Sequence, residues 1–197
     1  MKISSVLLSD IGKFIRGITF SPDDITEQEG PEIVRCMRTK NIQESLEVKD
    51  LWKLNRSLIK NDEKYLREGD ILISSANSWN LVGKACWIPK LSYESSFGGF
   101  TTVLRADQSK INPRYLYYWF ISKNIQTLLR SFANKTTNIS NLDLKRAYSL
   151  RVPHPPLEEQ QRIVSILDSV NSILKKREKI IYIFDKFIFS KFNYLFN

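Results

Sequence analysis

The sequence is poor in the residues that many catalytic and metal sites need. Its 197 residues include one histidine, His154, and two cysteines, Cys36 and Cys86, which do not form a C-x-x-C motif. Because His154 stands between prolines and is alone, we expect neither a histidine-based metal site nor a Ser-His-Asp triad. Two cysteines cannot supply a disulfide framework, so reduced thiols in the cytoplasm are the expectation.

Long apolar runs are also missing. The first ten residues contain an apolar run of only three, too short for the core of a signal peptide. No window of about 18 uninterrupted apolar residues occurs, so we expect no membrane span. No G-x-x-x-x-G-K-[ST] phosphate-binding loop is present either. With 42% hydrophobic and 12% aromatic residues, the chain can still form a sizeable core.

Acidic residues are fewer than basic ones, 21 against 30, which gives a formal net charge of +9. Residues 105–151 contain nine basic and two acidic residues, a net charge of +7 (nine minus two). Tyrosine, tryptophan and asparagine lie between these basic residues. Lys and Arg can neutralise phosphates, and Asn can bond base edges. The segment fits a face that binds nucleic acid, and a solvated basic surface is the alternative.

Short strand-like segments occupy the first 150 residues. They are rich in β-branched or aromatic residues and bounded by Gly, Pro, Ser or Asn, and they lie at 32–37, 70–74, 82–88, 100–104 and 148–152. One helix is expected to begin at Asn112-Pro113, because Asn caps helices and Pro suits the first turn. Its apolar face would contain Leu116, Trp119, Phe120, Leu128 and Leu129. The pattern predicts an α+β domain over residues 1–152.

The C-terminal segment, 153–197, has a different pattern. Residues 153–156 contain three prolines, which mark a boundary, and no Gly or Pro follows them. Two heptad rows of apolar residues then predict one long helix; they are Ile166, Ile173, Ile180, Phe187 and Tyr194, and Leu167, Leu174, Ile181, Ile188 and Leu195. Because the apolar stripe is too long for one domain to cover, we expect a partner helix.

One fragment is typical of an enzyme. Pro22-Asp23 followed by Glu47-Val-Lys49 has the letters and spacing of a P-D…E-x-K nuclease, in which two carboxylates hold magnesium. The pattern is short and occurs by chance in many sequences. A magnesium-dependent nuclease therefore stays open as an alternative function, and a coiled-coil assembly protein is another.

Fragments spread over roughly nine-tenths of the chain resemble one family when they are taken in order. They are 11–20, 34–43, 69–75, 81–84, 96–100, 113–118, 138–142 and 155–163. The last, Pro-Pro-Leu-Glu-Glu-Gln-Gln-Arg-Ile, is the most specific because it joins the proline boundary to the long helix. The chain resembles the DNA specificity subunits of type I restriction–modification systems.

The resemblance implies a target recognition domain with short twisted strands and flanking helices, followed by a conserved spacer helix in an antiparallel coiled coil. It implies a subunit without chemistry of its own that selects a bipartite site on double-stranded DNA and docks methylation and restriction subunits. No cofactor is expected, since S-adenosylmethionine would be bound by the methylation subunits. Family subunits usually carry two recognition domains and two spacer helices, whereas this sequence has one of each and looks like a half-subunit, whether natural or cut from a longer chain. Together with the two heptad rows, the resemblance predicts a homodimer through the C-terminal helix.

Polar loops on a rigid scaffold can present side chains to a DNA groove. The reading loop, residues 75–80, and the segment 134–138 are the best candidates for base contacts; the loop lacks a glycine that is common in the family. The candidate DNA-binding residues are Arg35, Arg38, Lys40, Asn41, Ser75, Asn77, Ser78, Asn80, Lys84, Lys135, Thr136, Thr137, Asn138, Lys145 and Arg146. The candidate dimer-helix residues are Ile166, Leu167, Val170, Ile173, Leu174, Ile180, Ile181, Phe184, Phe187 and Ile188.

Overall fold

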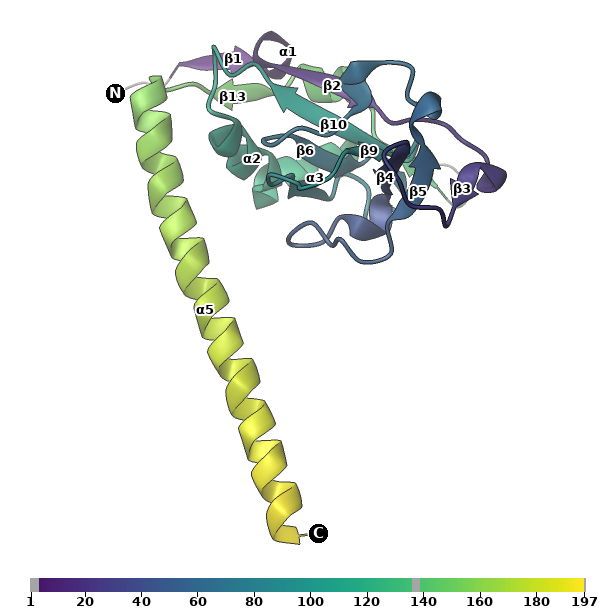
Figure 1. Cartoon of the computed structure of the whole chain (residues 1–197). Coiled ribbons are helices and arrows are strands. Elements are labelled where there is room, and N and C mark those ends of the chain that lie inside the picture. Colours follow the sequence, from purple (N-terminus) through teal and green to yellow (C-terminus); the bar gives the residue numbers. More distant parts are fainter. Residues whose placement is uncertain (1–3, 136–138, 197) are drawn as a thin grey trace.

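The computed structural model describes residues 4–135 and 139–196 and consists of an N-terminal domain and one long helix (Figure 1). The N-terminal domain runs from β1 (Ser5–Leu7) to β13 (Arg151–Pro153), and these two strands pair antiparallel. β1 therefore lies beside the point at which the helix α5 (Leu157–Phe196) leaves the domain. Within the described residues, no helix is long and apolar enough to cross a membrane.

A four-stranded antiparallel sheet lies at the centre of the N-terminal domain. Its order is β2 (Gly12–Arg16), β10 (Thr101–Ala106), β6 (Ile71–Ser74) and β8 (Ala85–Trp87). Because successive side chains point to opposite faces of a strand, β6 places Ile71 and Ile73 in one core and Leu72 in another. Burial on both faces explains why this strand is an unbroken apolar run.

Different elements cover the two faces of the central sheet. One face packs on α2 (Pro113–Ile121) and α3 (Lys123–Ser131), which bury Leu116, Phe120 and Leu129. The other face packs on a second sheet that contributes Met37 and Phe97. The order of that sheet is β3 (Ile25–Thr26), β5 (Trp52–Asn55), β4 (Ile33–Met37) and β9 (Ser95–Phe97), with β9 parallel to β4.

Gly17 allows the central and second sheets to meet closely. A Cβ atom at this position would lie 2.1 Å from the carbonyl oxygen of Gly98, which no side chain can tolerate. Backbone hydrogen bonds hold this contact, since Ile18 N–H donates to the carbonyl of Phe97 over 2.8 Å and Gly17 N–H to that of Thr101 over 3.2 Å. The turn between β9 and β10 is therefore fixed against the end of β2.

Smaller elements complete the domain. A third sheet has the order β11 (Asn134–Lys135), β12 (Ser140–Asn141) and β7 (Ala76–Asn77). Two short helices, α1 (Leu8–Ile11) and α4 (Leu144–Tyr148), precede β2 and β13. Single 3-10 turns occur at Pro22–Asp24, Thr39–Asn41, Arg56–Leu58 and Asp62–Lys64.

The α+β fold predicted from the sequence is confirmed, with three local corrections. The strand predicted at 82–88 begins only at Ala85, because Gly83 adopts a positive φ of 83° in a turn. The strand predicted at 148–152 begins at Arg151, since Tyr148 still belongs to α4. The single helix predicted after Asn112 is two helices, because Ser122 is extended, with φ −59° and ψ 145°, between α2 and α3.

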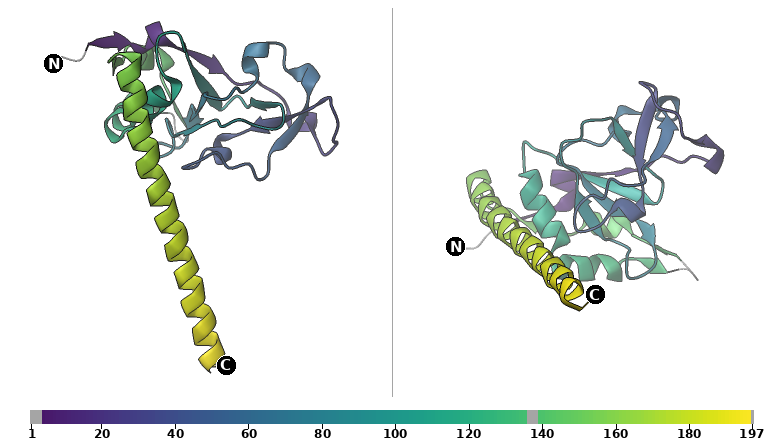
Figure 2. Two further views of the ribbon diagram at one scale, coloured as in Figure 1. Left: turned by 60° about the vertical axis from the view of Figure 1, so that its left-hand side comes forward. Right: turned by 60° about the horizontal axis from the view of Figure 1, so that its bottom comes forward.

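The predicted long helix is confirmed as α5, which has 40 residues and is therefore about 60 Å long. Its first turns lie against the N-terminal domain, where Gln160 and Val164 are buried. Beyond them α5 extends away from the domain as a single rod (Figure 2). Almost every side chain from 172 to 192 is exposed, including the apolar ones.

Candidate nucleic-acid interface

The third sheet joins the two segments that the sequence marks as candidates for base contacts. The reading loop contributes β7, the segment 134–138 contributes β11, and β12 lies between them in the sheet. β12 and β7 pair antiparallel, with Ser140 opposite Asn77 and Asn141 opposite Ala76. A further bond runs from Leu142 N–H to the carbonyl of Ser75 over 2.8 Å. Two segments about 60 residues apart in the sequence thus form one surface.

Within the reading loop, hydrogen bonds order the backbone and leave the tip exposed. The amide of Asn77 donates to Ser74 Oγ over 3.0 Å, and its Oδ1 accepts from Ser78 N–H over 2.8 Å. Ser75 and Asn77 are half-buried, whereas the side chains of Ser78 and Asn80 are exposed. Hydrogen bonds therefore hold the base of the loop, while Ser78, Trp79 and Asn80 are exposed to solvent.

Two predicted phosphate contacts lie close to this sheet. Lys145 and Arg146 are exposed in the first turn of α4, whose N-cap, Asp143, follows β12 by two residues. The guanidinium of Arg146 lies over the ring of Phe132, 4.3 Å from its centroid. In the described part of the chain, neither side chain forms an ion pair, so both charges are available to an anion.

Three of the nine basic residues in 105–151 are neutralised by the protein itself. Arg105 binds both carboxylate oxygens of the buried Asp70, at 2.8 and 2.7 Å. Lys110 pairs with Asp107 at 3.0 Å, and Arg114 with Asp168 at 2.9 Å. The net charge of +7 thus overstates what this segment offers to DNA, because part of it holds the fold together.

The candidates Arg35, Arg38 and Lys40 also have partners within the protein. Arg35 pairs with Glu29 at 2.6 Å, and this hydrogen bond is the main reason that the pKa of Glu29 is lowered. Lys40 pairs with Asp50 at 2.6 Å and lowers the pKa of that carboxyl in the same way. Arg38 stacks on Trp52 with its guanidinium 4.0 Å from the ring centroid. These residues contribute less free charge than the sequence implies.

The prediction that Asn41 contacts DNA is wrong. It is fully buried, and its amide donates to the carbonyls of Glu47 and Lys49 at 2.9 and 3.2 Å, while its Oδ1 accepts from Arg38 N–H at 2.8 Å. Every one of these bonds closes the loop that follows β4. Its role is structural, because a buried side chain with satisfied hydrogen bonds cannot reach a base.

Lys84 borders the reading loop through its backbone, since Ser74 N–H donates to its carbonyl over 2.8 Å. Its ammonium group points elsewhere and donates to Gln43 Oε1 over 2.7 Å. Both side chains line a cleft of about 950 Å³ between the domain and α5. The remaining candidates, Thr136, Thr137, Asn138 and the side chain of Lys135, lie outside the described residues.

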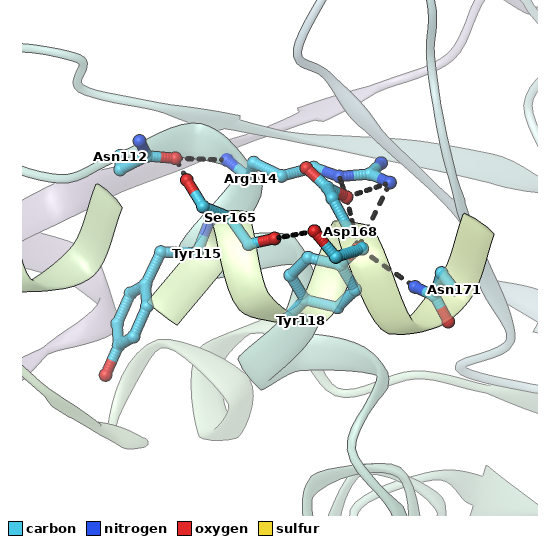
Figure 3. A network of polar contacts seen from close by, with 8 residues as sticks. Asn112, Arg114, Tyr115, Tyr118, Ser165, Asp168 and Asn171 are labelled. Atoms are coloured by element: carbon cyan, nitrogen blue, oxygen red, sulfur yellow. Dashed lines mark hydrogen bonds and ion pairs between the residues drawn. The ribbon is translucent and has the colours of Figure 1, made fainter. Parts of the chain in front are cut away.

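The sequence reasoning missed the junction between the domain and α5, a polar network shown in Figure 3. Arg114 Nε and Nη2 donate to Asp168 Oδ1 at 3.0 and 2.9 Å. Tyr118 donates its hydroxyl proton to the same carboxylate and accepts from Asn171 Nδ2 at 2.9 Å. Burial and the hydrogen bond to Asp168 raise the pKa of Tyr118. No local pattern indicates this network, because its partners are about 50 residues apart.

Two glutamines add a second point of attachment. Gln160 Oε1 accepts from Asn112 N–H over 2.9 Å, and its amide donates to the carbonyl of Pro155 over 2.8 Å. Gln161 Oε1 accepts from the side chain of Asn112 over 2.8 Å. The residue that caps α2 is thus bonded to the first turns of α5, and the direction of α5 relative to the domain is fixed at two places.

The face of α5 that lines the cleft is mostly polar and includes Asn171, Ser172, Lys175 and Lys179. At 100° per residue, the row that begins at Ile166 lies on the other side of the helix, whereas Leu174, of the row that begins at Leu167, borders the cleft. Of the candidate dimer-helix residues, Leu167 is half-buried, and the others are exposed by 47–65%: Ile166, Val170, Ile173, Leu174, Ile180, Ile181, Phe184, Phe187 and Ile188. The apolar face of α5 is open to a partner.

Comparison with known proteins gives consistent results. The family model "Type I restriction modification DNA specificity domain" matches residues 2–183. The chain is 27% identical to the type I restriction enzyme StySPI specificity subunit of Salmonella potsdam over 185 residues, which is 91% of this chain and 39% of the relative. It is also 27% identical to the EcoKI specificity subunit of Escherichia coli, with the same two coverages. The chain thus spans about two fifths of the curated relatives it matches.

Solved structures agree on the fold. The crystal structure of the HsdS subunit from Thermoanaerobacter tengcongensis superposes with a TM-score of 0.63 and 19% identity, over 87% of this chain and 38% of that one. The S subunit from M. genitalium gives a TM-score of 0.59 and 16% identity, over 89% and 41%. Because the family model covers most of the sequence and the fold agrees, the chain belongs to the type I restriction modification DNA specificity domain family.

Proposed function

We propose that this chain selects the DNA target of a type I restriction–modification complex and directs its methylation and restriction subunits to that target without performing chemistry itself. The observation that carries the proposal is the third sheet, which unites the reading loop with the strand after segment 134–138. The exposed Lys145 and Arg146 stand beside it and would contact phosphates. Supporting this, the family consists of specificity subunits.

The nuclease alternative gains no support. Glu47 uses its carboxylate to accept from Lys49 N–H over 3.0 Å, which closes their own loop. In the part of the chain that the structure describes, no three His, Cys, Asp or Glu side chains gather as a metal site would require. The curated relatives are specificity subunits. A pure coiled-coil assembly protein explains less of the structure, because assembly alone gives the reading loop no function.

We propose that residues 1–152 contact DNA and that 153–197 pair with a second copy as an antiparallel coiled coil. The open apolar face of α5 supports this pairing, because side chains such as Ile173 and Ile180 gain free energy only when a partner covers them. Two copies related by a two-fold axis would present the same surface twice in opposite orientation. The expected target is therefore an interrupted palindrome, two inverted half-sites with unspecified base pairs between them.

The test is to co-express the chain with the methylation subunits of its system, which would bind S-adenosylmethionine, and to map the methylated bases. Methylation at a two-fold symmetric, interrupted sequence is expected. Incubation of the chain alone with DNA and Mg²⁺ should leave the DNA intact. An asymmetric target would contradict the homodimer, and cleavage by the lone chain would contradict the non-catalytic assignment.

A deletion in α5 tests whether the helix sets the spacing of the half-sites. Removal of residues 176–182 deletes one heptad, keeps the apolar rows in phase and spares the junction at Asp168 and Asn171. The arm then shortens by about 10 Å, so the unspecified gap should shrink by roughly three base pairs. A gap of unchanged length would show that α5 does not determine the spacing.

A further inference from the structure

Phe100 is the most exposed large apolar side chain of the N-terminal domain within the described residues, at 65%. It directly precedes β10 and follows the pair Gly98-Gly99. Together with Ile18, Phe20 and Trp52 it lines an apolar hollow of about 650 Å³. The ring nevertheless stays largely in solvent, so burial within the domain does not explain its presence.

The backbone of Phe100 is part of the base of the reading loop. Its carbonyl accepts from both Ser75 N–H and Ala76 N–H, at 3.0 and 3.1 Å. The turn before it is closed by Thr101, whose N–H and Oγ1 donate to the carbonyl of Gly98 at 2.9 and 2.7 Å. The close contact of Gly17 with Gly98 fixes the same turn from below. These contacts fix the backbone of Phe100 beside the reading loop, and its ring is exposed there.

The surroundings favour DNA over a protein partner. The cores of protein interfaces are apolar and poor in charge, whereas the reading loop bonded to Phe100 exposes the polar Ser78 and Asn80 on either side of Trp79. Arg38 and Lys40 also line the adjoining hollow, where Arg38 stacks on Trp52 and Lys40 pairs with Asp50. An aromatic ring at the base of the reading loop would lie close to a base edge that this loop contacts.

We propose that Phe100 reads the C5-methyl group of a thymine next to the bases that the reading loop contacts. This inference rests on the proposed function. Base edges in the major groove display hydrogen-bond donors and acceptors, and the thymine methyl is the apolar group among them. A rigid, exposed ring can recognise that group alone, whereas Asn and Ser recognise the polar ones. Phe100 is thus a specificity-determining residue of a different chemical kind from its neighbours.

The experiment uses the complex of the full chain with its methylation subunits and a duplex oligonucleotide that carries the mapped target. Each thymine is replaced in turn by deoxyuridine, which removes only the methyl group. We expect one position per half-site at which the replacement weakens binding about fourfold, the effect of exposing one buried carbon. For Phe100→Ala the same replacement should have no effect, and the slope of affinity against salt should match that of the parent.

Leu157→Ala is the matched control, because Leu157 is also exposed, at 47%, but lies in the first turn of α5. It should keep the thymine effect, and Phe100→Leu should keep part of it. If deoxyuridine weakens the parent and Phe100→Ala equally, or if neither half-site contains a thymine, the inference is wrong. If the parent complex binds no sequence in preference to others, the proposed function fails instead.

Discussion

Phe97, Phe120 and Leu104 in the N-terminal domain are fully buried, whereas Ile173 and Ile180 in α5 each expose 65% of their surface. Elements of the domain enclose two cores around its central sheet, and the first turns of α5 add Ile163 and Val164 to one of them. In contrast, α5 leaves the domain after its first turns, and only a partner can cover its apolar rows. One chain thus combines a domain whose large apolar side chains are covered within the chain with a helix whose apolar rows are exposed.

The largest effect is expected when the proposed pairing of α5 with a second copy is disrupted. The double variant Ile173→Glu and Ile180→Glu would bury unpaired carboxylates in the proposed seam and should cost several kcal/mol of association free energy. Sedimentation should then give the mass of a single chain. The control is Lys175→Gln with Lys179→Gln, which makes the same change in net charge on the cleft-lining face. Equal masses for the parent and the Glu variant would mean that α5 is not the dimer seam.

The next effect concerns the domain alone. Gly17→Ala places a Cβ atom within 2.1 Å of the carbonyl oxygen of Gly98, and overpacking of this kind costs about 1–3 kcal/mol or more. Urea unfolding should show the loss as a lower midpoint. In Gly99→Ala the nearest backbone atom is the carbonyl oxygen of Ile18 at 3.4 Å, so its loss should be smaller. Similar losses for both variants would refute the close contact at Gly17.

A smaller effect is expected at the junction between the two regions. Asp168→Ala leaves Arg114 and Tyr118 without their shared carboxylate. Since Asp168 is partly exposed, we expect a loss of about 1 kcal/mol in the free energy of unfolding. The exposed pair of Glu159 with Arg162 provides the control, and Glu159→Gln should change unfolding by less. A null result at Asp168 would mean that the glutamine contacts alone hold α5.

The smallest effect concerns the salt dependence of DNA binding, and it distinguishes basic side chains without an ion pair from those that already pair with an acid. Arg146→Ala should lower the slope of log affinity against log salt by about 0.9, the value of one phosphate contact. Lys40→Ala should lower it by less, because Asp50 already neutralises Lys40. Salt titrations of DNA binding measure both slopes. If the two variants behave alike, the ion pairs within the domain do not decide which cations meet DNA.

Local pattern was enough for features that depend on neighbours in the sequence. The heptad rows predicted α5, and Asn112 caps α2 as expected, with its side chain accepting from Arg114 N–H and Tyr115 N–H. The break at Ser122 was missed because the apolar face continues across it. The extended backbone of Ser122 separates α2 from α3, and the apolar residues on either side do not indicate this break.

Tertiary contacts decided the rest. Asn41 had the composition of a DNA contact, but burial against the loop at Glu47 turned it into a structural residue. The pairing of Ser140 with Asn77 gathered two candidate segments, and no sequence pattern specified that register. The count of basic residues was misleading for the same reason. Arg105 and Arg114 form ion pairs with Asp70 and Asp168, which are distant in the sequence.

The pairing of β1 with β13 also has a consequence for how such proteins can evolve. It places the first strand beside the root of α5 (Figure 1). In an antiparallel pair, the tip of one α5 reaches the root of the other and therefore comes near its partner's first strand. A link from the tip of α5 in one unit to β1 of a second unit would then span only a short distance. The same architecture could be encoded once and assembled from two copies, or encoded twice and folded from one, and each half of a fused gene could then change its DNA sequence preference independently.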